Sequence, residues 1–184
     1  QAQEAYIDYF SSGKIAYGEF SVHNLFSVDE GRWLNNKCYF IPTAEGDLLA
    51  LLNSKLFWFC VTAQSVAVRG GYFQMHSQFV ERTPIAKSTN DQKAELGTLA
   101  KSAQTAAETR YALQQSITRR IPDLAADPAN TKLTTKLKEW WALPDFAAFQ
   151  KEVKKALKAD IPLRDRNEWE SWIAETRAQI VALT

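Results

Sequence analysis

Apolar residues in the first half of the chain occur in short groups separated by turn residues, a pattern typical of β-strands. The segment 14–20 partly alternates between apolar and polar positions, and Asp29-Glu30-Gly31 is a turn signal. The pattern predicts short strands over residues 14–20, 24–28 and 37–42.

A leucine-rich segment follows these strands and extends to Cys60. Gly46-Asp47 precedes it, and Asp47 is a residue type that caps helices, so we expect one buried helix with a broad apolar face. Gly70-Gly71 then predicts a turn, because paired glycines adopt backbone angles that other residues resist. A short strand or extended segment should follow and end at Thr83-Pro84-Ile85.

The second half has helical periodicity. Ser88-Thr89-Asn90-Asp91 is a cluster of N-cap residues, and it predicts a long helix that reaches about Ile121. Apolar residues at helical spacing predict further helices over 132–141, after Asp145 and beyond Pro162. The long helix has a heptad seam at Leu96, Leu99, Ala103, Ala106, Arg110, Leu113 and Ile117.

Composition divides the chain near Pro84. Residues 1–86 hold 15 of the 22 aromatic residues, with 6 basic and 8 acidic side chains, whereas residues 87–184 carry 16 basic and 13 acidic ones. We expect an α+β protein: a small sheet with a buried helix over residues 1–86, followed by a helical, bundle-like region over 87–184 packed on it.

Overall composition restricts the class of protein. The chain has 184 residues, 46% apolar and 23% charged, and its net charge of +1 excludes a polyelectrolyte-like binder but not a local basic patch. Cys38 and Cys60 are expected to be buried free thiols of a cytoplasmic protein. His23 and His76 lie in no Cys/His cluster, so no metal site is expected, and no segment is long and apolar enough for a membrane.

Catalytic motifs are nearly absent from the sequence. No glycine-rich nucleotide loop, nucleophile elbow or zinc-protease motif occurs. Pro144-Asp145 with Glu152 and Lys154 matches a nuclease-like pattern, but Asp145 is better interpreted as a helix N-cap. Trp140, Trp141, Trp169 and Trp172 could stack on nucleotides but are better interpreted as core. Lys151, Lys154, Lys155 and Lys158 could contact phosphates but are most simply a solvated face.

An ordered series of segments over about residues 14–86 resembles a known family. These segments are Lys37-Cys38-Tyr39-Phe40-Ile41-Pro42, Leu48 to Leu56 with Asn53-Ser54-Lys55, Arg69-Gly70-Gly71-Tyr72, Gln78-Phe79 and Thr83-Pro84-Ile85. They are similar to the TaqI-like C-terminal specificity domain, the target-recognition domain of adenine-specific DNA methyltransferases and type IIG restriction–modification enzymes. More loosely, Trp140-Trp141, Phe146 to Phe149 and Arg166 to Glu170 resemble the helical C-termini of the large fused enzymes.

The resemblance implies a role in bacterial defence as the DNA-reading fragment of a larger enzyme. The parent enzyme would bind S-adenosylmethionine through a methyltransferase domain, and Mg²⁺ if it also carries a nuclease domain, and this chain contains neither domain. The hallmark Asn-Pro-Pro-Tyr-type tetrad is absent here. We therefore expect this chain to bind double-stranded DNA and the parent's N-terminal domain, without a cofactor and without enzymatic activity of its own.

Side-chain chemistry points independently to possible base contacts. Arginine pairs with guanine, and asparagine or glutamine with adenine, when loops or strands hold these side chains in fixed geometry. Two stretches supply such groups, and glycines in the second would let the backbone approach a phosphate. The candidate DNA-binding residues are Arg32, Asn35, Asn36, Lys37, Arg69, Gly70, Gly71, Gln74 and His76. Lys14 is a weaker candidate, whereas Asn53 and Ser54 are expected to bond nearby backbone.

Two alternatives come from other classes. The heptad seam and the tryptophan-rich tail could form a helical protein–protein interaction module without DNA binding. An autonomous nuclease using Asp145, Glu152 and Lys154 would instead cleave DNA in the presence of Mg²⁺.

Overall fold

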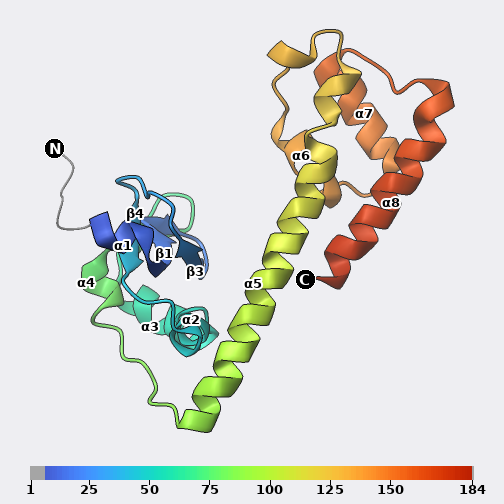
Figure 1. Ribbon diagram of the computed structural model, residues 1–184. Coiled ribbons are helices and arrows are strands. Elements are labelled where there is room, and N and C mark those ends of the chain that lie inside the picture. The colour runs from blue at the N-terminus through green and yellow to red at the C-terminus, as the bar shows by residue number, and fades with distance from the viewer. Residues whose placement is uncertain (1–6, 184) are drawn as a thin grey trace. The chain divides into compact units, whose positions relative to one another are not determined.

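The computed structural model describes residues 7–183 and has mixed α+β architecture, which confirms the predicted fold class. The chain divides into two compact units, Gln1–Gln104 and Thr105–Thr184. The long helix α5 (Asn90–Thr118) crosses this division (Figure 1). The division lies later than the composition change near residue 86, because the first turns of α5 pack within the N-terminal unit through Ala100.

The N-terminal unit contains two antiparallel three-stranded sheets. The first has the order β3-β1-β4 and the second β2-β6-β5, so the central strands are β1 and β6. The strands are β1 (Gly13–Gly18), β2 (Phe20–Ser21), β3 (Ser27–Glu30), β4 (Cys38–Ile41), β5 (Ala67–Val68) and β6 (Tyr72–Gln74). The helices are α1 (Ile7–Ser11), α2 (Gly46–Leu52), α3 (Lys55–Gln64) and α4 (Ser77–Val80).

The strand predicted over residues 14–20 is two strands in different sheets. β1 ends at Gly18, Glu19 lies between, and β2 begins at Phe20. In the first sheet Ile15 is paired with Val28 and Ile41, while in the second Phe20 is paired with Gln74. Glu19 therefore occupies the point at which the chain changes sheets.

The predicted single leucine-rich helix is wrong, because the segment breaks after Leu52. Ser54 begins a second helix: its Oγ accepts a hydrogen bond from the backbone N–H of Phe57 at 3.1 Å. Asp47 is not the cap of α2, whose N-cap position is Glu45 without a side-chain bond. The Asp47 carboxylate instead lies in the first turn, 3.8 Å from Lys93 Nζ.

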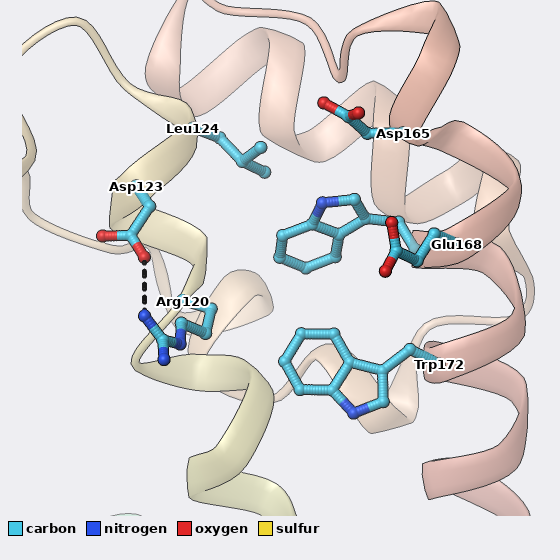
Figure 2. A pocket seen from close by; sticks show the side chains of 7 residues that line it. Arg120, Asp123, Leu124, Asp165, Glu168 and Trp172 are labelled. Atoms are coloured by element: carbon cyan, nitrogen blue, oxygen red, sulfur yellow. Dashed lines mark ion pairs between the residues drawn. The ribbon is translucent and has the colours of Figure 1, made fainter.

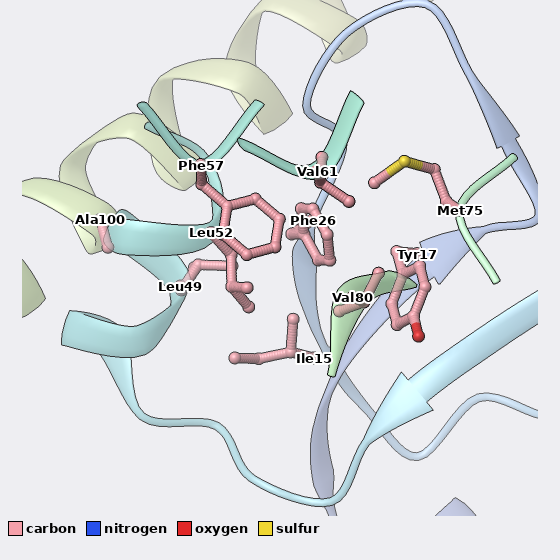
Figure 3. Packing of buried hydrophobic residues seen from close by; sticks show 10 residues of the cluster. All are labelled: Ile15, Tyr17, Phe26, Leu49, Leu52, Phe57, Val61, Met75, Val80 and Ala100. Atoms are coloured by element: carbon pink, nitrogen blue, oxygen red, sulfur yellow. The ribbon is translucent and has the colours of Figure 1, made fainter. Parts of the chain in front are cut away.

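The core of the N-terminal unit lies between the sheets and the helices α2 and α3. Figure 3 shows Ile15, Leu52 and Phe26 directed toward one another, with Ala100 of α5 at the edge of the cluster. Only part of the predicted apolar helix face is buried, since Leu56 and Phe59 are 68% and 70% exposed.

The segment before α5 differs from the prediction. After β6 the chain forms the short helix α4, and residues 83–85 have no regular structure, so the closing extended segment is only partly present. Thr83 is buried, its hydroxyl donating to the Phe79 carbonyl at 2.8 Å and accepting from Gln64 Nε2 at 2.6 Å. Its role is to anchor the chain against α3.

The helix α5 begins as predicted. Thr89 Oγ1 accepts from Gln92 N, and Thr89 N donates to Gln92 Oε1, which together form a capping box. The predicted seam is mostly half-buried: Leu99 and Ala103 are exposed, and only Ile117 of the seven positions is fully buried.

The C-terminal unit is helical and has its own core. Its elements after α5 are η2 (Ile121–Leu124), η3 (Pro128–Asn130), α6 (Thr135–Lys138), η4 (Trp140–Ala142), α7 (Phe146–Leu157), η5 (Leu163–Asp165) and α8 (Arg166–Ala182). Trp140, Phe149 and Val153 are fully buried at its centre. The Trp140 indole N–H donates to the Gln114 carbonyl at 3.1 Å, so the core is tied to α5 by a polar contact.

Cys38 and Cys60 are both free and half-buried rather than buried. Over residues 7–183 no helix combines the length and apolar character needed to cross a membrane.

Candidate nucleic-acid interface

The β3–β4 loop carries four of the candidate residues, and Asp29 anchors its start. The Arg32 backbone N–H donates to Asp29 Oδ1 at 2.9 Å, and Arg32 Nε lies 3.6 Å from Asp29 Oδ2. The Arg32 side chain is nevertheless 88% exposed. Its terminal guanidinium nitrogens are thus presented to solvent from a fixed backbone position.

Two asparagines follow in the same loop. Asn35 Oδ1 accepts from the Lys37 backbone N–H at 2.9 Å, and the Asn35 carbonyl accepts from Cys38 N at 3.1 Å. Both Asn35 and Asn36 are exposed. Within residues 7–183, the Asn35 amide nitrogen and the Asn36 side chain form no hydrogen bond, so both can donate to a ligand.

Glu19 joins this loop to the end of β6. Its carboxylate lies 2.7 Å from Lys37 Nζ and 3.5 Å from His76 Nε2. Its backbone adds two further ties, since Glu19 N donates to the Lys37 carbonyl and Met75 N donates to the Glu19 carbonyl. Two candidate stretches that are distant in sequence are thereby brought to one place.

The Glu19–Lys37 ion pair is electrostatically favourable. The contact with the Lys37 ammonium lowers the pKa of the Glu19 carboxyl, and the contact with Glu19 raises the pKa of Lys37. Both groups therefore stay charged at neutral pH. The Lys37 side chain is 65% exposed, so the ammonium is still accessible to a second anion.

The β5–β6 hairpin carries Arg69, Gly70, Gly71 and Gln74, and His76 follows it at the N-cap position of α4. Gly70 and Gly71 have φ of 89° and 79°, which confirms the predicted glycine-dependent turn. Arg69 is exposed at this turn, whereas Gln74 is half-buried with its backbone N–H donating to the Val66 carbonyl. The turn and Gln74 are at opposite ends of β6, about 10 Å apart along the strand. The hairpin tip is therefore not joined to the Glu19 network.

Two residues change role relative to the sequence analysis. Lys14 is fully buried and pairs with Asp29 at 2.9 Å, so it is not available to a ligand. Glu19 was not among the candidates, although a charged residue inside an otherwise strand-like segment was a signal that could have found it.

The motif around Asn53 is structural, as predicted. Asn53 Nδ2 donates to the carbonyls of Phe26 and Leu49 at 2.9 and 3.0 Å, and Asn53 Oδ1 accepts from Phe26 N at 3.2 Å. Asn24 Nδ2 donates to the Ser54 carbonyl at 2.6 Å. These bonds hold the segment before β3 against the break between α2 and α3.

The nuclease-like residues do not form a site. Asp145 caps α7 by accepting from Ala148 N at 2.7 Å, and the buried Glu152 accepts from Thr134 Oγ1 at 3.1 Å. Lys154 is exposed and pairs loosely with Asp160 at 3.8 Å. Among the described residues, no group of three or more His, Cys, Asp or Glu side chains could hold a metal ion.

The tryptophans belong largely to the C-terminal core, as predicted, whereas the lysine run lies on the surface. Trp140 is fully buried, while Trp141, Trp169 and Trp172 are half-buried around the C-terminal core. Lys151, Lys154, Lys155 and Lys158 are all exposed.

Comparison with known proteins places the C-terminal half in a family. The family model described as "Domain of unknown function (DUF8810)" matches residues 89–184, or 96 of 184 residues. The chain therefore belongs to the DUF8810 family, whose description states no activity. No curated protein and no solved structure matches the chain.

Proposed function

We propose that the N-terminal unit recognises duplex DNA in a sequence-specific manner, as the target-recognition part of a restriction–modification enzyme of the adenine-methyltransferase class. One observation carries the proposal. Glu19 pairs with Lys37 through its carboxylate and bonds the Lys37 and Met75 backbone through its own, so an exposed Arg/Asn loop and the end of β6 lie together. Arginine and asparagine donors on a short anchored loop suit the edges of guanine and adenine.

The charge balance of this surface supports base contacts more than phosphate contacts. Arg32 and Lys37 each have a carboxylate partner, Asp29 and Glu19 respectively. Non-specific DNA binding depends on uncompensated basic residues and falls steeply with salt. We therefore expect the chain to bind DNA weakly on its own, with the parent enzyme supplying further phosphate contacts.

The resemblance to TaqI-like specificity domains supports the same proposal. The parent would carry S-adenosylmethionine on a separate domain and act in the cytoplasm, where its DNA substrate is. This chain would then do no chemistry itself.

A selection experiment tests the proposal. The full chain is incubated with a randomised duplex pool at low salt, bound DNA is recovered and sequenced, and the procedure is repeated at higher salt. Enrichment of a short motif that persists with salt is the expected result. Sequence-blind binding that vanishes with salt, or no retention at low salt, would contradict it, and the latter would favour the protein-interaction alternative.

Charge-matched variants separate base contacts from bulk electrostatics. Arg32→Ala should relax the enriched motif at one position and cost about 1–3 kcal/mol of discrimination. Lys87→Ala removes the same charge from an exposed site outside the surface and should leave the motif unchanged. Equal effects of the two substitutions would show that Arg32 does not contact a base.

A further inference from the structure

The C-terminal unit contains a cavity that the proposed DNA surface does not use. Its volume is about 420 Å³, within the range of small-ligand sites, and it lies inside the family-matched residues. Figure 2 shows its labelled side chains arranged around an open space between the η2 segment and α8. The lining residues are Arg120, Asp123, Leu124, Asp165, Glu168, Trp169 and Trp172.

One wall of the cavity is aromatic and fixed by the core. The rings of Trp169 and Trp172 lie 5.5 Å apart at an interplanar angle of 52°. Trp169 also stacks on the fully buried Phe149 at 5.9 Å, so its position is set by core packing. The indole faces carry partial negative charge, which attracts a cation placed over them.

The remaining lining is mainly acidic. It has three carboxylates and one guanidinium, a formal charge of −2. Arg120 is already paired with Asp123 at 3.6 Å, and Asp165 is paired with the largely exposed Arg164 at 3.2 Å. Within residues 7–183, Glu168 forms no ion pair. Glu168 is exposed and lines the same cavity as the two indoles, which leaves one acceptor group for a bound cation.

We propose that this cavity binds an arginine side chain of a protein partner. A planar guanidinium can stack on an indole face and donate two parallel hydrogen bonds to a carboxylate, a combination that an ammonium group does not offer. A nucleotide would place phosphate charge against three carboxylates and is disfavoured. The site is independent of the DNA surface, because every lining residue belongs to the C-terminal unit.

The indole N–H signals of the ¹⁵N-labelled full chain test the proposal directly. The six tryptophans give six such signals, and Trp169→Phe and Trp172→Phe assign the two that matter. We expect acetyl-arginine-amide to shift these two signals saturably, and the uncharged isostere acetyl-citrulline-amide to require at least roughly tenfold higher concentration. Equal shifts with both probes, or stronger shifts with dAMP, would overturn the proposal.

A matched pair of variants identifies the carboxylate. Glu168→Gln should weaken acetyl-arginine-amide binding by roughly fivefold, because it removes the acceptor charge. Glu170→Gln changes an exposed residue of the same helix outside the cavity and should have no effect. Equal effects of the two variants would mean that acetyl-arginine-amide responds only to the net charge of the protein, and this would overturn the proposed site.

The source of the arginine is tested with a peptide. Acetyl-Gly-Gly-Arg-Gly-Gly-amide should bind at least as tightly as acetyl-arginine-amide if the cavity accepts a side chain from an extended protein segment. Binding weakened roughly tenfold would indicate that flanking backbone does not fit, and it would overturn the assignment to a protein partner.

Discussion

The two units are stabilised by different kinds of interaction. Between residues 7 and 80, the N-terminal unit assembles ten short elements, and side-chain-to-backbone bonds such as those of Asn53 and Asn24 connect segments that are distant in sequence. The C-terminal unit packs longer helices around large aromatic side chains, with Trp140 and Phe149 fully buried. Both units have an apolar core, but the N-terminal unit also depends on polar side chains that connect distant segments, whereas large aromatic side chains fill the C-terminal core.

This difference matters for where each unit can carry function. Short strands and loops fixed by hydrogen bonds present exposed polar groups in defined positions, as the β3–β4 loop does. The helical C-terminal unit instead has a cavity between the η2 segment and α8, beside Trp172.

The largest effect is expected from truncating the C-terminal core. Trp140→Ala removes a fully buried indole and its bond to Gln114, and should cost about 4 kcal/mol of unfolding free energy. Peptide-level hydrogen exchange on the full chain should show lost protection in residues 105–183 and retained protection in the N-terminal unit. Leu163→Ala, at an 80% exposed side chain, is the control with an expected change under about 0.5 kcal/mol. An equal loss of hydrogen-exchange protection in both units would contradict the expectation that Trp140 stabilises only the C-terminal unit.

In the N-terminal unit, a large loss of stability is expected from breaking the ion pair between Lys14 and Asp29. Asp29→Asn leaves the fully buried Lys14 ammonium without its charged partner and should cost about 3 kcal/mol at pH 7. Urea unfolding followed by hydrogen exchange measures this loss. Glu30→Gln, at the exposed neighbouring position, should change stability by less than about 0.5 kcal/mol.

The same pair has a defined pH dependence. Burial raises the pKa of Asp29, but the hydrogen bonds from Lys14 and from Arg32 N outweigh it, so the pKa lies below its ordinary value. Because the pKa of Asp29 is lower in the folded state, its ionised carboxylate stabilises the fold at pH values above its pKa in the unfolded chain, about 4. This stabilisation is lost as the pH falls through the pKa of Asp29 in the folded protein. The stability gap between the wild type and Asp29→Asn should therefore be constant above about pH 5 and shrink below about pH 4. If the difference in unfolding free energy between the two proteins were unchanged at pH 2.5, it would not come from the Lys14–Asp29 ion pair.

A smaller effect is expected where polar ties fix the loop before β3. Asn53→Ala removes three hydrogen bonds to the backbone of Phe26 and Leu49, and should cost about 2 kcal/mol. Thermal unfolding of the full chain measures it, with Asn36→Ala as the exposed control. Indistinguishable melting of the two variants would show that water replaces these bonds without loss.

The sequence predicted the features that depend on local chemistry. The glycine turn at Gly70-Gly71, the start of the long helix and the capping role of Asp145 all follow from short-range preferences, and the structure confirms them. The structural role of Asn53 was also predictable, because asparagine competes for backbone partners wherever a helix can break.

The features that sequence reasoning missed depend on distant partners. Glu19 became important only because the chain changes sheets at that residue and meets Lys37 and His76. Lys14 was misjudged because its partner Asp29 lies across a strand pair that periodicity does not specify. The break in the leucine-rich segment was missed because apolar periodicity continues through it.

The contact between α2 and α5 is a further example, and it gives the smallest predicted effects. A Cβ added at Gly46 would lie 2.9 Å from the Gly97 Cα, a backbone atom that cannot move aside, so Gly46→Ala should destabilise the N-terminal unit by about 1–2 kcal/mol. Substitution of Gly97, on the other side of this contact, should have the opposite effect. A Cβ at Gly97 meets no atom closer than 3.9 Å, and alanine is favoured over glycine inside a helix. Gly97→Ala should therefore raise stability by up to about 1 kcal/mol. Urea midpoints of the two variants that shift in opposite directions are the expected result, whereas destabilisation by both would mean that α5 needs the glycine for a reason other than space.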